Sequence, residues 1–208
     1  MKLYKMKSFQ EDGLLHALDM IISKRIYLST CDYVNDIDEG SWNYTDHKDN
    51  SFLEIANSVR AIVDAQRFTC FLKSINNPLM WAHYAGGFSG IAIKYNFDQR
   101  ELDVRKMKYD GVPGLSIEQM KSISTGECSP QDAGILRSKA KCWYYEDEWR
   151  LYGKGEDEYI EGIKPDAIIF GGRQNKYVSV VREVARKFDV RVGYLNPTRS
   201  MDYKVVYT

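Results

Sequence analysis

The sequence lacks the features that mark several large classes of protein. No apolar run approaches the roughly 20 residues that a membrane span needs, and no apolar stretch of signal-peptide length follows the basic N-terminal residues. The four cysteines stand singly, without the paired spacing of a zinc site or the density of a disulfide scaffold. We therefore expect a cytoplasmic protein with reduced thiols and no metal site.

The chain also has no excess charge of either sign. Its 29 lysines and arginines balance 29 aspartates and glutamates, so no overall field draws it to nucleic acid or to an anionic membrane. Only five prolines occur, and no Gly/Ser-rich linker or internal repeat interrupts the chain. We expect residues 1–208 to form a single domain with no membrane partner; the sequence leaves the oligomeric state open.

Hydrophobic spacing predicts an α+β fold. Apolar residues recur at helical spacing in residues 11–22, 52–65, 78–84 and 177–187. Strand-forming residues predict strands at 3–6, 25–30, 67–73, 90–95, 101–108, 148–153, 167–170, 190–194 and 203–207. Residues 111–138 show no clear period. Because strands come in runs, we predict a mixed, mostly antiparallel sheet with flanking helices, and the helix at 52–65 is expected beside the one at 11–22.

Carboxylates, a guanidinium and aromatic rings gather in residues 143–152, Trp-Tyr-Tyr-Glu-Asp-Glu-Trp-Arg-Leu-Tyr. The two-residue period of a strand would place Glu146, Glu148 and Arg150 on one face. Neighbouring carboxylates raise each other's pKa and a guanidinium lowers it, so the trio can hold a base or a partner for developing positive charge. A solvated strand face with one ion pair is the alternative. The flanking aromatic residues favour a pocket wall.

A second candidate block spans residues 80–90, Met-Trp-Ala-His-Tyr-Ala-Gly-Gly-Phe-Ser-Gly. Helical spacing brings Trp81 near Tyr84, and the glycines allow a tight turn or close approach of a ligand. These glycines match neither the dinucleotide-binding pattern nor the Walker pattern. His83 is also a candidate, although a lone histidine in a helix is more often structural.

Blocks of sequence over nearly the whole chain carry a family resemblance. They are Leu3-Tyr4-Lys5, Ile26-Tyr27-Leu28-Ser29, Asn35-Asp36, Met80-Trp81-Ala82-His83-Tyr84-Ala85-Gly86, Gly90-Ile91-Ala92-Ile93, Trp143-Tyr144-Tyr145-Glu146-Asp147-Glu148-Trp149-Arg150-Leu151 and Ile168-Ile169-Phe170-Gly171. In this order they resemble the bacterial and phage family catalogued as domain of unknown function 2971, some members of which are labelled abortive-infection or phage-resistance proteins. One departure is Ile37-Asp38-Glu39, where the family usually shows proline and an aromatic residue before glutamate. The resemblance implies a role in phage defence.

A second resemblance, at the level of the fold, is to the ADP-ribosyltransferase scaffold. That scaffold has a split mixed sheet, which opens with a strand carrying His or Arg, continues with a helix and a strand ending in Ser or Thr, and places a glutamate on a late strand. Residues 2–5, 11–22, 25–30 and 146–150 follow this order, with Tyr4 and Lys5 in place of His or Arg.

The scaffold resemblance implies roles for individual residues. Tyr27 and Ser29 would lie against the nicotinamide ribose of NAD. Trp81 and Tyr84 would stack on rings of the dinucleotide. Glu148 would hydrogen-bond a ribose hydroxyl and stabilise an oxocarbenium-like transition state. In the same arrangement Glu146 would orient the acceptor.

We therefore expect a nucleotide-binding enzyme that uses NAD as its substrate and transfers ADP-ribose to a protein or nucleic-acid acceptor, or cleaves the glycosidic bond. The catalytic candidates are Glu148, Glu146 and Arg150. The binding candidates are Tyr4, Lys5, Tyr27, Ser29, Trp81, His83 and Tyr84. The alternative is a non-catalytic module that recognises a nucleotide or a protein in the conflict between phage and host. An RNA nuclease is disfavoured by the balanced charge and the scattered histidines.

Overall fold

The computed structural model describes residues 1–45, 52–155, 157–197 and 203–208. Its α-helices and 3-10 helices are α1 (Gly13–Ile22), η1 (Cys31–Tyr33), α2 (Phe52–Asp64), α3 (Pro78–Tyr84), α4 (Ile117–Ser124), η2 (Lys141–Glu146) and α5 (Val178–Lys187). Its strands are β1 (Lys2–Lys7), β2 (Ile26–Tyr27), β3 (Asn43–Tyr44), β4 (Phe68–Leu72), β5 (Ile91–Asn96), β6 (Val104–Lys106), β7 (Gly114–Leu115), β8 (Glu148–Tyr152), β9 (Tyr159–Ile160), β10 (Ala167–Phe170), β11 (Arg191–Pro197) and β12 (Tyr203–Tyr207). The predicted α+β class is confirmed.

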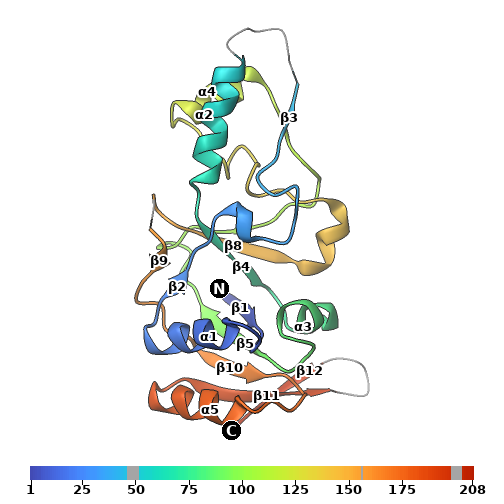
Figure 1. The fold of residues 1–208 in the computed structure, drawn as a ribbon, viewed down its shortest axis with the longest axis vertical. Coiled ribbons are helices and arrows are strands. Elements are labelled where there is room, and N and C mark those ends of the chain that lie inside the picture. Colours follow the sequence, from blue (N-terminus) through green and yellow to red (C-terminus); the bar gives the residue numbers. More distant parts are fainter. Residues whose placement is uncertain (46–51, 156, 198–202) are drawn as a thin grey trace.

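Eight strands form one sheet in the order β12-β11-β10-β5-β1-β4-β8-β6 (Figure 1). β10 and β11 are parallel, and the other neighbouring pairs are antiparallel, as predicted. β1 pairs with β5 over six positions and β4 with β8 over five. A single pair, Tyr4 opposite Leu72, joins β1 to β4. The sheet is therefore weakly joined at its centre, between a β5–β1 half and a β4–β8 half.

Helices cover both faces of this sheet. Along β5, Ile91 and Ile93 belong to the apolar cluster under α1 and α5, whereas Ala92 belongs to the cluster under α3. This alternation follows from the two-residue period of a strand. Trp81 of α3 is fully buried in the second of these clusters. The sheet thus has an α1/α5 face and an α3 face.

A further apolar cluster lies beyond the β4–β8 half of the sheet, where α2 packs against α4 (Figure 1). The expectation that residues 52–65 pack beside the helix at 11–22 is therefore wrong, because α1 packs against α5 instead. The unexpected partner, α4, begins at a capping box formed by Ser116 and Gln119. That Ser-x-x-Gln signal lies within the segment where the apolar period is weak.

Two predicted strands are shorter than expected. Of residues 25–30, only Ile26–Tyr27 forms a strand, and it pairs with β9. Ser29 forms an isolated bridge to Phe68. Of residues 101–108, only Val104–Lys106 is a strand, because Glu101 N–H donates to the Asp98 carbonyl and closes a turn. Local strand propensity is outweighed in both segments by the neighbouring turns.

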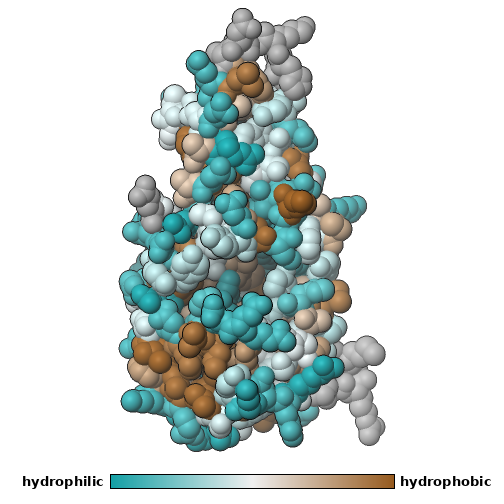
Figure 2. All heavy atoms as spheres, in the orientation of Figure 1, coloured by the Kyte–Doolittle hydropathy of each residue, from teal (hydrophilic) through white to brown (hydrophobic). Residues whose placement is uncertain are grey.

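Apolar side chains gather on the surface over α1 and α5 (Figure 2). Leu15 and Ile22 of α1 and Val180 of α5 are exposed there. Among the described helices, none combines the length and the apolar character needed to cross a membrane.

Candidate functional site

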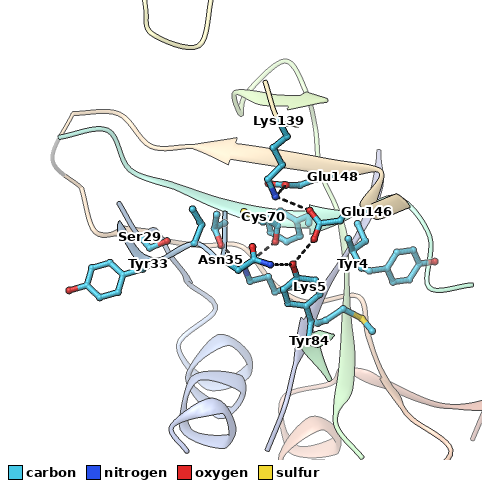
Figure 3. A pocket seen from close by; sticks show the side chains of 15 residues that line it. Tyr4, Lys5, Ser29, Tyr33, Asn35, Cys70, Tyr84, Lys139, Glu146 and Glu148 are labelled. Carbon is cyan, nitrogen blue, oxygen red and sulfur yellow. Dashed lines mark hydrogen bonds and ion pairs between the residues drawn. The ribbon is translucent and has the colours of Figure 1, made fainter. Parts of the chain in front are cut away.

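A pocket of about 240 Å³ lies where β1 and β4 separate (Figure 3). Both strands, the segment around η1, α3, η2 and β8 contribute to its walls. The lining residues are Tyr4, Lys5, Met6, Ser29, Tyr33, Val34, Asn35, Thr69, Cys70, Phe71, Leu72, Tyr84, Lys139, Glu146 and Glu148. Lys5 Nζ of β1 donates to Thr69 Oγ1 (2.7 Å) and to the Cys70 carbonyl oxygen of β4 (3.0 Å), so a side chain links the two strands beyond their single ladder pair.

Five buried charges form a continuous chain of ion pairs beside the pocket, which we call the charged row. Arg150 donates from both terminal nitrogens to the Glu39 carboxylate (2.6 Å each). Its Nε donates to Glu148 Oε1 (2.6 Å). Lys139 Nζ lies 2.8 Å from Glu148 Oε2 and 2.8 Å from Glu146 Oε2. None of the five side chains is more than 3% exposed. Each charge therefore depends on its neighbours in the row for compensation.

Tyr84 and Asn35 extend the charged row across the pocket (Figure 3). The Tyr84 hydroxyl donates to Glu146 Oε1 (2.5 Å), and Asn35 Nδ2 donates to the same hydroxyl (2.8 Å). Burial and the hydrogen bond to Glu146 raise the pKa of Tyr84, so its hydroxyl stays protonated. The loop that follows η1 therefore meets α3 and η2 through side-chain contacts at the pocket.

The row keeps Glu148 ionised. Burial alone raises the pKa of its carboxyl, but the charges of Arg150 and Lys139 outweigh burial and hold the pKa at about 2, below the ordinary 4.5. Burial likewise lowers the pKa of Lys139, and the charges of Glu148 and Glu146 raise it well above its ordinary value. A carboxylate held in this state is a poor proton donor or acceptor at neutral pH. It is suited to stabilising positive charge.

The charged row has one more anion than cations, because three carboxylates face two basic groups. Lys5 is the other basic residue at the pocket wall, and burial lowers the pKa of its amine. Burial and the nearby Glu148 raise the pKa of the Cys70 thiol to about 12, so the thiol stays protonated and is not a nucleophile at neutral pH. The pocket wall thus carries two carboxylates, Glu146 and Glu148, together with the amines of Lys5 and Lys139.

The pocket brings together most of the residues predicted from the sequence. Tyr4 and Lys5 come from β1, Ser29 follows β2, and Tyr84 ends α3. Glu146 and Glu148 complete this group. These six residues lie on segments far apart in the chain, and their roles in binding or catalysis stay predictions.

The expectation that Glu146, Glu148 and Arg150 share one strand face is partly wrong. Glu146 ends η2, and Asp147 then adopts a left-handed conformation (φ 44°), so β8 begins only at Glu148. Lys139 nevertheless holds both carboxylates. Arg150 is fully buried between Glu148 and Glu39, over the ring of Phe68, and does not line the pocket. It is placed to position Glu148 rather than to touch a ligand.

Three predicted binding residues lie outside the pocket walls. Trp81 is buried in the α3 face of the core, stacks on Phe88 (5.7 Å) and donates from Nε1 to the Ile75 carbonyl (2.8 Å). A residue committed to the core cannot stack on a dinucleotide in this arrangement. Tyr27 is exposed on β2, and its ring contacts Tyr159. His83 is exposed on α3.

Trp81→Phe should therefore lower stability without weakening ligand binding. The change leaves the buried Ile75 carbonyl without its donor, and we expect a loss of about 1–3 kcal/mol in the free energy of unfolding, measured by urea denaturation. Affinity for any pocket ligand should stay within about twofold of wild type. A loss of affinity for a pocket ligand at unchanged stability would show that Trp81 takes part in binding.

Sequence reasoning missed several residues of the site. Lys139 and Glu39 belong to the charged row, and Asn35 and Thr69 line the pocket. No local signal separates Lys139 from the other basic residues. Glu39 lies in the acidic segment 35–40, which fits no calcium-binding motif and predicts only a loop. A buried cation on β8 requires a carboxylate partner, which is the one indirect signal for Glu39.

Comparison with known proteins gives no match to this chain among family models, curated proteins or solved structures.

Proposed function

We propose that the pocket binds NAD by its cationic nicotinamide ring, and that the protein cleaves the nicotinamide–ribose bond and transfers ADP-ribose. The observation that carries this proposal is an ionised Glu148 at the wall of a pocket whose charged row has a surplus negative charge. In a site of low dielectric, such a surplus attracts the pyridinium ring of the oxidised cofactor.

The size and walls of the pocket fit one aromatic ring with part of a sugar. Its volume of about 240 Å³ is below the roughly 300–1,000 Å³ of pockets that enclose whole drug-sized ligands. Tyr4, Tyr33, Phe71 and Tyr84 supply aromatic surface, which attracts a cationic ring through its π faces. The adenosine half of NAD would then lie outside this pocket.

The proposed reaction needs no proton transfer at Glu148. As the glycosidic bond breaks, nicotinamide leaves with the bonding electron pair, and positive charge develops on the ribose. The Glu148 carboxylate stabilises that charge. Water or an acceptor then forms the new bond to the ribose carbon and loses a proton. Glu146 and Tyr84, joined by a hydrogen bond at the pocket, are placed to orient the incoming group.

The broader setting of this function is proposed from the sequence blocks alone. Their resemblance to the domain of unknown function 2971 family suggests a cytoplasmic phage-defence protein. A protein or nucleic-acid acceptor is consistent with that setting.

Oxidised NAD should bind at least about tenfold more tightly than NADH, because only the oxidised ring is a cation. Isothermal titration calorimetry on the wild-type protein measures both affinities. The minimal pair of 1-methylnicotinamide and nicotinamide repeats the comparison without the adenosine half. Equal affinities within each pair, or no binding of any of the four compounds, would rule out a cationic-ring pocket.

A non-catalytic binding module is the second candidate. It is favoured by one observation: both Glu148 oxygens are held by internal cations and the side chain is 2% exposed, as in ion pairs that serve structure. In that case NAD binds, but incubation with cell extract releases no nicotinamide and labels no target.

A further inference from the structure

Lys139 is the only described cation that contacts both pocket carboxylates. Its Nζ lies 2.8 Å from an oxygen of Glu146 and 2.8 Å from an oxygen of Glu148. These two oxygens are therefore within about 6 Å of each other, the range in which like charges strongly disfavour joint ionisation. The ammonium group also lies over the Trp143 ring, 5.2 Å from its centre.

We propose that Lys139 is a positioning residue, which holds the carboxylates of Glu146 and Glu148 side by side at the pocket and offsets the repulsion between them. The proposal deepens the proposed function and rests on it for its catalytic meaning. Glu148 has a second cation, Arg150, whereas Glu146 has Tyr84 as its other partner. Without Lys139, Arg150 would be the one cation of the charged row left to offset the two carboxylates. Arg150 is also paired with Glu39.

Several other polar and titratable groups surround Glu146 and Glu148, and they determine how far another residue can replace Lys139. Arg150 and Glu39 continue the charged row, Cys70 lies on β4, Tyr84 on α3 and Lys5 on β1, and the Tyr109 hydroxyl accepts a hydrogen bond from the Glu148 amide. Apart from Arg150, Lys5 is the one basic residue among these groups, and it donates to Thr69 and the Cys70 carbonyl. Lys5 is thus already engaged and does not replace Lys139.

The test is a carboxyl NMR titration of the protein labelled with ¹³C-glutamate, with signals assigned by Glu146→Gln and Glu148→Gln. In Lys139→Met, we expect one carboxyl of the pair to take up a proton at least about two pH units above wild-type Glu148. Lys139→Arg should restore the wild-type titration. Lys141→Met, an exposed lysine two residues away, is the matched control and should leave it unchanged.

Turnover supplies the second readout. In Lys139→Met, the rate of nicotinamide release should fall as the pH is lowered through the range in which the Glu146–Glu148 pair takes up a proton. Wild type and Lys141→Met should show no such fall in rate over the same pH range. If NAD proves not to be turned over, the titration alone still decides the role of Lys139, so the two proposals fail separately.

A titration of Lys139→Met identical to wild type would overturn the proposal, as would an equal shift in Lys141→Met. If Lys139→Met does not fold, the double variant Lys139→Met/Glu146→Gln removes the repulsion and should fold, with Glu148 titrating within about one unit of wild type. A double variant that also fails to fold would assign Lys139 a purely structural role.

Discussion

Replacing Arg150 by methionine should lower the free energy of unfolding by about 3–5 kcal/mol. The guanidinium is fully buried and forms four hydrogen bonds, two to Glu39, one to Glu148 and one to the Leu136 carbonyl. Its removal leaves Glu39 without a cation in the charged row and Glu148 with Lys139 alone. Chemical denaturation followed by circular dichroism measures the loss. Methionine keeps much of the volume, so the effect reports charge rather than a cavity.

Arg100→Met is the matched control, because Arg100 pairs with Asp98 at the surface and its side chain is 88% exposed. Such pairs contribute about 0–1 kcal/mol. The double variant Arg150→Met/Glu39→Gln should recover part of the stability, since one stranded carboxylate is gone. A loss in Arg150→Met no larger than in Arg100→Met would show that the stability of the charged row does not depend on Arg150.

The ion pairs of Glu148 should also make the free energy of unfolding fall at acid pH. The pKa of Glu148 is about 2 in the folded protein and ordinarily 4.5, so its ion pairs stabilise the fold fully above about pH 4.5. That contribution is lost as the pH falls from about 4.5 toward about 2. In Arg150→Met the folded-state pKa should rise toward 4.5, because its first cationic partner is missing, and this part of the acid dependence should shrink.

Glu148→Gln should reduce nicotinamide release from NAD by at least about a hundredfold. Glutamine keeps the shape of the side chain and removes the negative charge that is proposed to stabilise the oxocarbenium-like transition state, and losing one such preorganised group costs about 10²–10³ in rate. The assay uses purified protein with NAD and cell extract, and a thermal melt checks that the variant is folded. Arg150 keeps its two bonds to Glu39, which favours folding.

Asp147→Asn is the matched control for that variant. Asp147 is the adjacent residue, pairs with Lys106 at the surface and lies outside the pocket walls. Asparagine also tolerates the left-handed conformation found there. We expect the control to retain wild-type turnover. A folded Glu148→Gln with wild-type turnover would exclude the catalytic role, and binding of NAD without turnover by any form would favour the binding module.

Local patterns were sufficient to predict most elements of the fold. The helix predicted at 177–187 is α5, Val178–Lys187, and the strand predicted at 167–170 is β10. The first has a strong helical period, and the second is a continuous apolar run that ends at Gly171. Prediction was poorer where an element is short or begins at a turn. Glu146 was predicted on a strand because nothing in its neighbourhood signals the left-handed Asp147 that separates η2 from β8.

Burial separated residues that look alike in sequence. Trp81 and Tyr84 lie in one helix and were both predicted to stack on a ligand, yet Trp81 is in the core and Tyr84 lines the pocket. Aromatic residues serve both purposes, and only the position of α3 against the sheet distinguishes them. The same applies to Arg150, whose full burial makes it a positioning residue.

The sequence by itself determined the fold class, most element positions and the two blocks that contribute Tyr84, Glu146 and Glu148 to the pocket, because these depend on periods and residue types within short segments. Only the tertiary structure decided which residues complete the charged row. Arg150 meets Glu39 across 111 positions of sequence, and Tyr84 meets Glu146 across 62. Such partners depend on the order of strands in the sheet and on the opening between β1 and β4, which no local pattern encodes.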